Sequence, residues 1–242
     1  RREARYLRKI FRASTAFAAR QDARQRVVWD RRYDSPALHA LLADPDRDLA
    51  SGAPLLKDGN TSTVWVARAE GRRFLVKRDN PKGLWHGAKR ALRGTRAARS
   101  WRNAHLMRLR GVPTAAPVAL LERRRGPLQG VAYFICECVE GPDCRTYFGS
   151  PDVRPEDKRA AAGKVAALIA ALRAARLSHG DLKATNILLS ADGPVLIDID
   201  ALRAHRSEAA FERAHAKDVE RFMRNWEGDP DLARLFEAAL AR

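Results

Sequence analysis

Apolar positions in the second half of the chain follow two different periods. Val165, Leu168, Ile169 and Leu172 recur at the three- and four-residue spacing of a single helix face. Pro155 and the two acidic residues after it are typical of the first turn of that helix. Further along, two short apolar runs flank a turn that contains Gly and Pro, a pattern that predicts a hairpin over residues 187–200.

The first half of the chain reads mainly as strands. Apolar runs separated by turn-forming residues predict extended segments at 55–56, 63–67, 74–77, 118–122 and 131–139. Helices are expected at 37–42, which Ser35 and Pro36 open, and near the end of the chain at 208–226 and 231–241. The predicted strands therefore lie before the predicted hairpin, and the longer helices lie on either side of it.

Polar residues gather at the open end of the predicted hairpin. Asp181, Lys183 and Asn186 precede its first strand, and Asp198 stands in the second apolar run. Because a hairpin brings its two ends together, we expect Asp181, Asn186 and Asp198 to converge. Two carboxylates, an amide and a lysine at one point suit a hard divalent cation and a phosphate group.

This pattern resembles the catalytic and metal-binding loops of protein-kinase-like phosphotransferases. Their loops carry His-x-Asp, a Lys two residues on, an Asn five after the Asp, and a second Asp after a short hairpin. Three motifs are most similar to the bacterial lipopolysaccharide core kinases of the Kdo/WaaP family. They are His-Gly-Asp-Leu-Lys-Ala-Thr-Asn at 179–186, Ile-Asp-Ile-Asp at 197–200 and Gly-Val-Pro-Thr at 111–114. The resemblance covers roughly residues 53–226.

The resemblance implies a role for each matching residue. Asp181 would be the catalytic base, and Lys183 would neutralise the transferring phosphoryl group. It implies ATP and Mg²⁺ as cofactors, with Asn186 and Asp198 as the metal ligands. The residues implied in nucleotide binding are Lys77 for the phosphates, Gly59, Thr61 and Ser62 in the phosphate-covering hairpin, the backbone of Glu137 and Val139 for adenine, and Asp143 for the ribose.

The same resemblance implies an α+β protein with a two-lobed protein-kinase-like fold. We expect a basic helical segment at 1–52, an N-terminal antiparallel β-sheet lobe that binds ATP at 53–140, and a small helical C-terminal lobe with the catalytic and metal loops at 141–242. Only 42 residues follow Asp200, which leaves no room for the lobe with which protein kinases hold a peptide. The length therefore favours a compact, non-peptide acceptor.

Two departures from the kinase pattern stand out. Only Gly59 remains of the glycine-rich loop, and no acidic residue lies between Asp79 and Glu122, where the helix Glu that pairs with the ATP lysine belongs. Ser100 stands near the position of that Glu. The missing Glu therefore disfavours regulation by movement of this helix, whereas it leaves the groups for phosphoryl transfer in place.

The charge balance favours an anionic partner. Forty-six Lys and Arg against 29 Asp and Glu give a net charge of +17. Residues 1–32 combine basic residues with apolar ones at helical spacing, which fits a helix on an anionic membrane or a helix packed on the fold. The basic run 78–102 fits a clamp for substrate phosphates or a solvated helix face. An Arg-rich genome is a further source of the charge.

The cysteines and hydropathy bear on the compartment. Cys136, Cys138 and Cys144 form neither a disulfide framework nor a zinc site, which fits a reducing cytosol. The most apolar long stretch falls short of a membrane span, and no signal peptide is recognisable. We expect a cytoplasmic enzyme, peripheral on the cytosolic face of the inner membrane.

Three functions are weighed on this basis. The first is phosphorylation of a Kdo or heptose hydroxyl of lipopolysaccharide core by ATP, with an anionic glycolipid as partner and no nucleic acid. The second is a protein kinase, or a small-molecule kinase of the aminoglycoside type. The third is a pseudokinase that binds glycolipid or nucleic acid. Retention of Lys77, Asp181, Asn186 and Asp198 disfavours the third.

Overall fold

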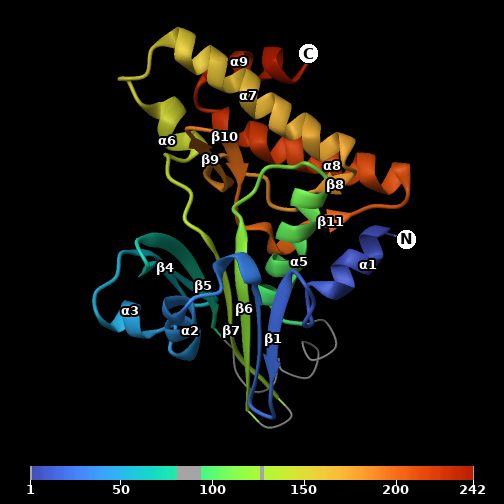
Figure 1. Cartoon of the computed structure of the whole chain (residues 1–242). Coiled ribbons are helices and arrows are strands. Elements are labelled where there is room, and N and C mark those ends of the chain that lie inside the picture. Colours follow the sequence, from blue (N-terminus) through green and yellow to red (C-terminus); the bar gives the residue numbers. More distant parts are fainter. Residues whose placement is uncertain (1, 81–93, 126–127, 242) are drawn as a thin grey trace. The chain divides into compact units, whose positions relative to one another are not determined.

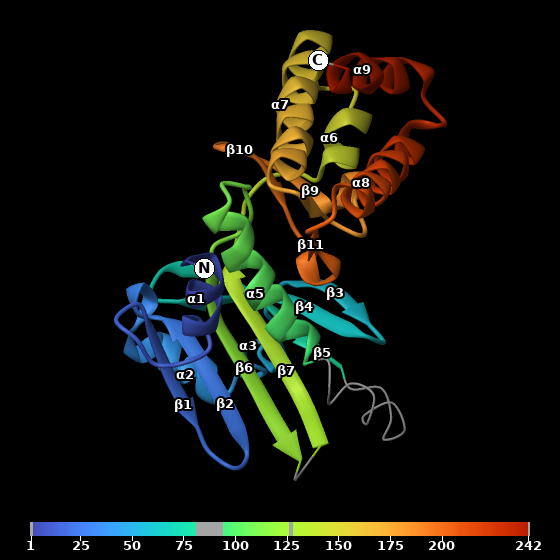
Figure 2. The ribbon, with the colours of Figure 1, turned by 90° about the vertical axis from the view of Figure 1, so that its right-hand side faces the viewer.

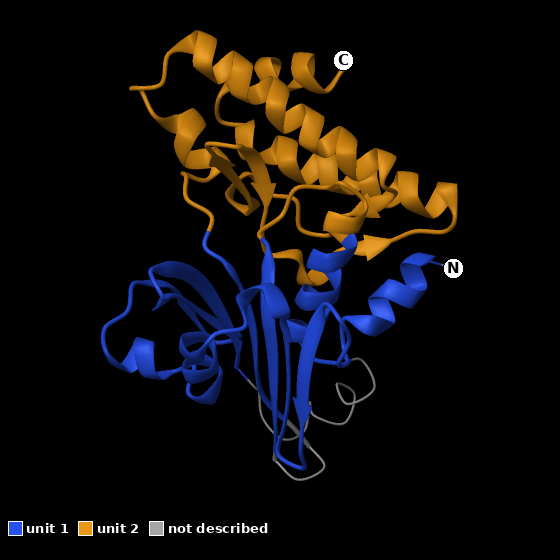
Figure 3. Ribbon diagram, in the orientation of Figure 1, with its two compact units in different colours: residues 1–106, 116–138 blue, residues 107–115, 139–242 orange. Residues whose placement is uncertain are grey.

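The computed structural model describes residues 2–80, 94–125 and 128–241. The chain divides into two compact units (Figure 3). Unit 1 comprises residues 1–106 and 116–138, and unit 2 comprises residues 107–115 and 139–242.

Unit 1 is built on an antiparallel sheet with the strand order β1-β2-β6-β7-β5-β4-β3 (Figure 1). Its strands are β1 (Phe17–Gln21), β2 (Gln25–Asp30), β3 (Leu55–Gly59), β4 (Ser62–Ala69), β5 (Arg72–Asp79), β6 (Pro117–Arg125) and β7 (Leu128–Glu137). Its helices are α1 (Arg2–Lys9), α2 (Pro36–Ala43), α3 (Arg47–Ala50) and α5 (Arg96–Leu109), the last of which ends in unit 2. The strands expected from residue 55 onward are confirmed.

The core of unit 1 uses both faces of this sheet. On one face, Leu38 and Leu41 of α2 join a buried cluster with Trp65, Tyr133 and Ile135 of the strands. Fully burying an apolar side chain of this size stabilises the fold by about 1.5–3 kcal/mol. Side chains along a strand alternate between the two faces of the sheet. The buried residues next to Trp65, Tyr133 and Ile135 in sequence therefore point to the opposite face, along which α5 runs in Figure 2.

The helical expectation for residues 1–52 is wrong for residues 17–30. These residues form β1 and β2, and β2 pairs with β6 in the register Val28↔Leu120. Val27, Val28 and Trp29 are all buried, so this stretch completes the sheet. Three consecutive apolar residues suit a strand whose two faces are both covered.

The apolar side of α1 packs inside unit 1. Leu7 and Ile10 are buried, and the carbonyl of Ile10 accepts a hydrogen bond of 2.9 Å from Nε1 of Trp101. The hydroxyl of Tyr6 lies 3.0 Å from Nδ1 of His105. Of the two interpretations of this basic segment, the structure therefore agrees with the helix packed on the fold.

Unit 2 is mainly helical. Its elements are α6 (Cys144–Gly149), α7 (Pro155–Ala174), β8 (Leu177–Ser178), β9 (Ile187–Ser190), β10 (Gly193–Leu196), β11 (Arg203–Ala204), α8 (Glu208–Met223) and α9 (Pro230–Leu240), with short 3₁₀ turns at 184–186, 199–201 and 224–226. Phe148, Phe222, Trp226 and Phe236 form its aromatic core, with ring centroids 4.8–5.8 Å apart. The predicted helix from Pro155 buries Val165, Leu168, Ile169 and Leu172, as its periodicity indicated. In the part of the chain that the structure describes, no helix combines the length and apolarity needed to cross a bilayer.

Candidate active site

Two pairs of short strands in unit 2 frame the polar loops. β9 and β10 form the expected hairpin, with Ile187 opposite Leu196. β8 and β11 pair through Ser178 and Arg203. The loops 179–186 and 197–202 are thus held at both ends by backbone hydrogen bonds, which fixes where their side chains emerge.

Asp181, Lys183 and Asn186 come together as the spacing predicts. Nζ of Lys183 lies 3.0 Å from Oδ2 of Asp181. Nδ2 of Asn186 donates to the backbone carbonyl of Asp181 at 2.8 Å and lies 3.4 Å from its Oδ2. The carboxylate of Asp181 is 32% exposed, so a substrate hydroxyl can reach it.

Asp198 stands next to this group in an uncommon backbone conformation. The N–H of Ile197 donates to the carbonyl of Asn186 at 3.0 Å, so the two loops meet one residue before Asp198. Asp198 itself has φ 55° and ψ 49°, the left-handed region that a non-glycine residue rarely adopts. Such a conformation persists only where its surroundings enforce it, and it is found most often at functional sites.

His179 braces the loop from inside. Its side chain is fully buried, Nε2 lies 3.0 Å from the carbonyl of Ile197, and Nδ1 lies 3.3 Å from the N–H of Asp181. These partners require a proton on Nε2 and a lone pair on Nδ1, which is the neutral form. Burial lowers the pKa of His179 below its usual value, in agreement with that assignment.

Two residues of α8 complete the loop, and the sequence reasoning missed both. Asp218 is buried and accepts hydrogen bonds from the N–H groups of His179 (2.6 Å) and Gly180 (2.9 Å). Arg221 donates to the carbonyl of Gly180 at 2.7 Å and to Oδ1 of Asp181 at 3.1 Å. The sequence held one signal for Asp218, because this carboxylate lies on the buried face of a predicted helix, three residues after His215. A carboxylate in such a position needs hydrogen-bond partners.

Gly180 is the residue that lets these contacts form. It has φ +81°, and a Cβ at this position would lie 2.9 Å from the backbone oxygen of Ala201. Only glycine combines that φ with so close an approach. The Gly in His-Gly-Asp thus lets His179 point inward while Asp181 points to solvent.

The segment that follows β7 docks on the hairpin. The N–H of Leu189 donates to the carbonyl of Pro142 at 2.9 Å, and a Cβ on Gly141 would lie only 2.2 Å from the oxygen of Leu189. Both carboxylate oxygens of Asp143 are engaged by Thr146, at 3.0 Å by its N–H and at 2.7 Å by its hydroxyl. Asp143 therefore caps α6, a structural role that the sequence reasoning had not assigned to it.

In unit 1, strand register positions Lys77. It lies opposite Val64 of β4 and Phe134 of β7, and Leu75 lies opposite Cys136. Lys77 and Cys136 are thus diagonal neighbours on one face of the sheet, and the charge of Lys77 acts on the Cys136 thiol. Burial nevertheless raises the pKa of Cys136 to about 12, so this thiol stays protonated.

The loop between β3 and β4 is held from β5 by Asn80. Its Nδ2 donates to the carbonyl of Gly59 at 3.0 Å and to the hydroxyl of Thr63 at 3.1 Å. Thr61 is half-buried, whereas Ser62 is only 1% exposed. The hydroxyl of Ser62 therefore lies inside the unit rather than on the loop surface, where phosphate contact was expected.

The remaining nucleotide residues lie where β7 ends. The N–H of Glu137, predicted to lie against adenine, donates to the carbonyl of Ala116 at 2.9 Å. Val139 is the first residue of this segment that belongs to unit 2. On α5, Ser100 is buried, and its hydroxyl has no hydrogen-bond partner among the described residues. Residues 81–93 of the basic run lie outside the described residues.

The comparison with protein families decides what this arrangement is. The sequence model of the lipopolysaccharide kinase (Kdo/WaaP) family matches residues 61–238, from the turn before β4 to α9. This chain belongs to the lipopolysaccharide kinase (Kdo/WaaP) family. It is therefore a phosphotransferase with a hydroxyl group as acceptor, and it acts on lipopolysaccharide core.

A solved structure agrees on the fold of this kinase. The structure "WaaP in complex with acyl carrier protein" is similar with a TM-score of 0.59 and 18% identity, over 86% of this chain and 87% of that chain. The expected α+β, protein-kinase-like fold, with an antiparallel sheet first and helices after it, is confirmed. No curated protein matches this chain.

The donor set of the kinase suits Mg²⁺ bound together with a nucleotide. Among the described residues, no group of three or more His, Cys, Asp or Glu side chains could hold a metal by itself. Mg²⁺ is commonly bound by one or two carboxylates together with substrate phosphates and water. Asn186 and Asp198 on the meeting loops fit that mode, in which the nucleotide completes the coordination.

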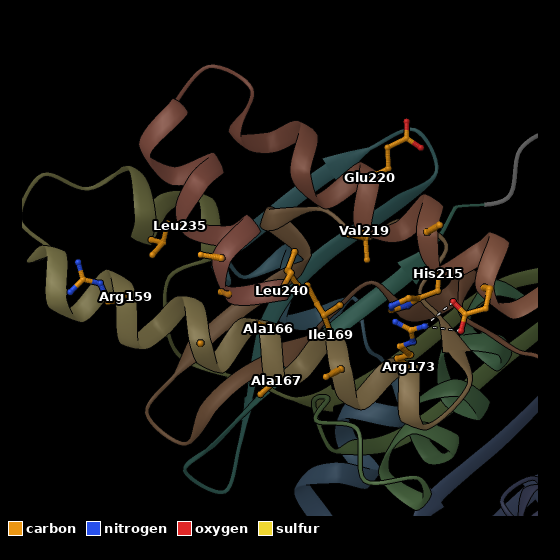
Figure 4. A pocket seen from close by; sticks show the side chains of 16 residues that line it. Arg159, Ala166, Ala167, Ile169, Arg173, His215, Val219, Glu220, Leu235 and Leu240 are labelled. Atoms are coloured by element: carbon orange, nitrogen blue, oxygen red, sulfur yellow. Dashed lines mark hydrogen bonds and ion pairs between the residues drawn. The ribbon is translucent and has the colours of Figure 1, made fainter. Parts of the chain in front are cut away.

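A cavity of about 1010 Å³ lies elsewhere in unit 2, among α7, α8 and α9 (Figure 4). Ala166, Ile169, Val219, Leu235 and Leu240 line it, with Arg159 and Arg173 among its polar residues. None of the site residues predicted from the sequence lines it. The cavity is therefore separate from the chemistry of the loops.

Proposed function

We propose that this kinase transfers the γ-phosphoryl group of ATP to a hydroxyl of Kdo or heptose in lipopolysaccharide core, at the cytosolic face of the inner membrane. The observation that carries the proposal is the Asp181 group. A partly exposed carboxylate has a lysine ammonium 3.0 Å from one of its oxygens and the Asn186 amide beside it. This is a base next to a cation, as phosphoryl transfer requires.

The residues then divide the reaction between them. Asp181 accepts the proton of the acceptor hydroxyl. At the same time the oxygen of that hydroxyl forms a bond to the γ-phosphorus, and the bond between the γ-phosphorus and the ADP oxygen breaks. Lys183 and Lys77 balance the negative charge on the phosphoryl oxygens. Asn186 and Asp198 would hold Mg²⁺, which supplies further charge neutralisation when it is bound with ATP. The groups that would contact the nucleotide are Gly59, Thr61, the backbone of Glu137 and Val139, and Asp143.

Transfer of radiolabelled phosphate from ATP tests the proposal. Purified lipopolysaccharide of defined core, a generic protein and an aminoglycoside serve as parallel acceptors. We expect label in the lipopolysaccharide alone, and sugar analysis then identifies the hydroxyl. Label in the protein or the aminoglycoside instead would favour the second of the three functions weighed above.

Asp181→Asn sharpens this test. Loss of the base is expected to lower turnover by about 10²–10⁴-fold while nucleotide binding survives. Asp192→Asn, on the exposed turn of the hairpin, is the matched control and should be as active as the wild type. Equal activity of Asp181→Asn and wild type would remove the basis of the assignment.

The high positive charge supports a peripheral location. At +17, the chain is attracted to the anionic surface of a bacterial inner membrane. Sedimentation with vesicles that contain anionic phospholipid, at low and high salt, tests this contact. We expect salt to release the protein, because exposed charges are screened beyond about 8–10 Å at physiological ionic strength. Equal recovery on uncharged vesicles would contradict an electrostatic contact.

An acyl carrier protein is a second partner that one observation supports. The similar WaaP structure is described as a complex with acyl carrier protein. The apolar cavity among α7, α8 and α9 has the volume to hold an acyl chain, and Arg159 in its lining suits an acidic carrier. Binding of palmitoyl and unacylated carrier protein is to be compared in wild type and Ala167→Phe, which narrows the cavity. Selective loss of the acyl-dependent binding is expected, and equal binding of both carriers would contradict this role.

A further inference from the structure

The charges of α8 are segregated around the helix. Glu208 and Glu212 pair with Arg176 and Arg173, at and just beyond the end of α7. Asp218 is buried and turned to the catalytic loop. Glu208, Glu212 and Asp218 thus have partners outside the helix.

The solvent side of α8 carries the basic residues. Arg213, Lys217, Arg221 and Arg224 recur at spacings of four, four and three, which places them on one face of the helix. The buried residues of α8, among them Phe211, His215 and Phe222, lie on the opposite face. From Arg213 to Arg221 this basic face extends about 12 Å along the helix axis.

Only one carboxylate interrupts the basic face. Glu220 is hydrogen-bonded to Arg224, and this bond, with the charges of Arg224, Lys217 and Arg221, lowers the pKa of Glu220. Lys217, Arg221 and Arg224 are thus close enough to one another to act on one carboxylate. Four basic residues against one acid leave the face positive.

This basic face leads to the reacting carboxylate. Arg221 binds Oδ1 of Asp181, whereas Lys183 binds Oδ2, so two cations approach the carboxylate from its two oxygens. One of the two balances the charge of Asp181 itself, and a surplus positive charge remains beside it. Asp218 and Arg221 both anchor α8 to the catalytic loop, so the basic face is held at a fixed position relative to Asp181.

We propose that the basic face of α8 is the acceptor subsite and that its residues Arg213, Lys217 and Arg221 bind an anionic group of the core oligosaccharide next to Asp181. The proposal rests on the proposed function and names the part of the chain that selects its substrate. The bound group is a carboxylate or phosphate on the acceptor sugar or its neighbour. Lys183, on the other oxygen of Asp181, remains for the transferring phosphoryl group.

The test uses the double variant Arg213→Ala/Lys217→Ala, which leaves the Arg221–Asp181 pair in place. The acceptor is a deacylated, soluble inner-core oligosaccharide that ends in Kdo, with its glucosamine phosphates either retained or enzymatically removed. Lys158→Ala/Lys164→Ala on α7 removes the same charge from the same unit and is the matched control. Initial rates give KM for acceptor and ATP, and kcat, for each protein.

We expect the α8 variant to raise the acceptor KM by about tenfold at low salt, with ATP KM and kcat within twofold of wild type. If the α8 variant raises the acceptor KM for both oligosaccharides, the bound group is the sugar carboxylate. If it raises the KM only for the phosphorylated oligosaccharide, the bound group is phosphate. Acceptor KM values equal to those of the α7 control would overturn the inference and leave the proposed function intact.

Calorimetric binding of the same oligosaccharides separates failure of the subsite from failure of the chemistry. If the wild type phosphorylates neither oligosaccharide, the proposed function fails, and binding alone then decides the subsite. Weaker binding by the α8 variant than by the α7 control supports the basic face as a glycan site. Equal binding by both rejects it.

Discussion

The loop at 179–186 of unit 2, proposed to be catalytic, and the strands around Lys77 in unit 1 place their polar side chains by different means. Lys77 is set by backbone register, because β5 pairs with β4 along its length and with β7 from Phe74 to Asp79. Asp181 lies in a loop without regular structure and is set by side chains, chiefly those of Asp218 and Arg221 on α8. A sheet shares its positioning among many backbone bonds, whereas a loop concentrates it in a few side chains. Single substitutions should therefore damage the loop more than the strands.

Removal of the Asp218 carboxylate is expected to have the largest effect. Asp218→Ala leaves the buried N–H groups of His179 and Gly180 without their acceptor, at about 1–3 kcal/mol for each. We expect the free energy of unfolding to fall by about 3 kcal/mol and turnover to fall at least about tenfold, because the loop loses its anchor. Urea unfolding and initial rates measure the two effects.

Asp218→Asn retains one acceptor oxygen, so its free energy of unfolding and its turnover should lie between those of the wild type and Asp218→Ala. An alanine variant with wild-type stability and turnover would show that the loop does not depend on this side chain, and the contrast between the units would then fail.

Gly180→Ala comes next. It forces an alanine into φ +81°, at about 1–2 kcal/mol, and brings its Cβ to 2.9 Å from the oxygen of Ala201. Gly111→Ala, at φ +73° with nothing within 4 Å of the added Cβ, isolates the cost of the backbone conformation. We expect Gly180→Ala to lose more stability and to lose activity as well. Equal losses in urea unfolding would mean that the close approach at Gly180 carries no energy.

A smaller effect is expected in unit 1. Asn80→Ala removes the side chain that holds the carbonyl of Gly59, but the pairing of β3 with β4 remains. We expect the ATP KM to rise about three- to tenfold with kcat nearly unchanged, because only nucleotide positioning is loosened. Asn80→Asp keeps the acceptor for Nε of Arg78 and loses the donor to Gly59, so it should resemble the alanine variant. A large fall in kcat would show that this loop is as dependent on single side chains as the catalytic loop.

The pH dependence of stability is expected to be the most modest effect. Burial lowers the pKa of His179 and of His215 below 6.5 in the folded protein. Such histidines take up a proton more readily after unfolding, so stability is lost as pH falls below about 6.5. We expect the urea midpoint to drop between pH 7 and pH 5, and His215→Gln to flatten the drop. A midpoint that rises over this range would contradict neutral histidines in the fold.

The sequence by itself determined what rests on local spacing. Asp181, Lys183 and Asn186 lie within six residues of one another and just ahead of a hairpin, so their convergence follows from chain geometry. The apolar periods likewise fixed α7, the hairpin and the strands from Leu55 onward, because period and length distinguish a helix face from a strand.

Only the tertiary structure decided what depends on distant partners. Asp218 and Arg221 reach the loop across 38 to 41 residues, and no local pattern reports such a bond. Asp143 also caps α6 by accepting two hydrogen bonds from Thr146, a role that its spacing in the sequence does not reveal.

The same holds for residues 17–30 and for Ser62. A short apolar run suits a strand or a helix equally, and pairing of β2 with β6 decides between them. The burial of Ser62 depends on what packs over the loop, which its own neighbours in the sequence do not specify. Spacing along the chain sets which groups can meet locally, and packing decides which of them remain available to a substrate.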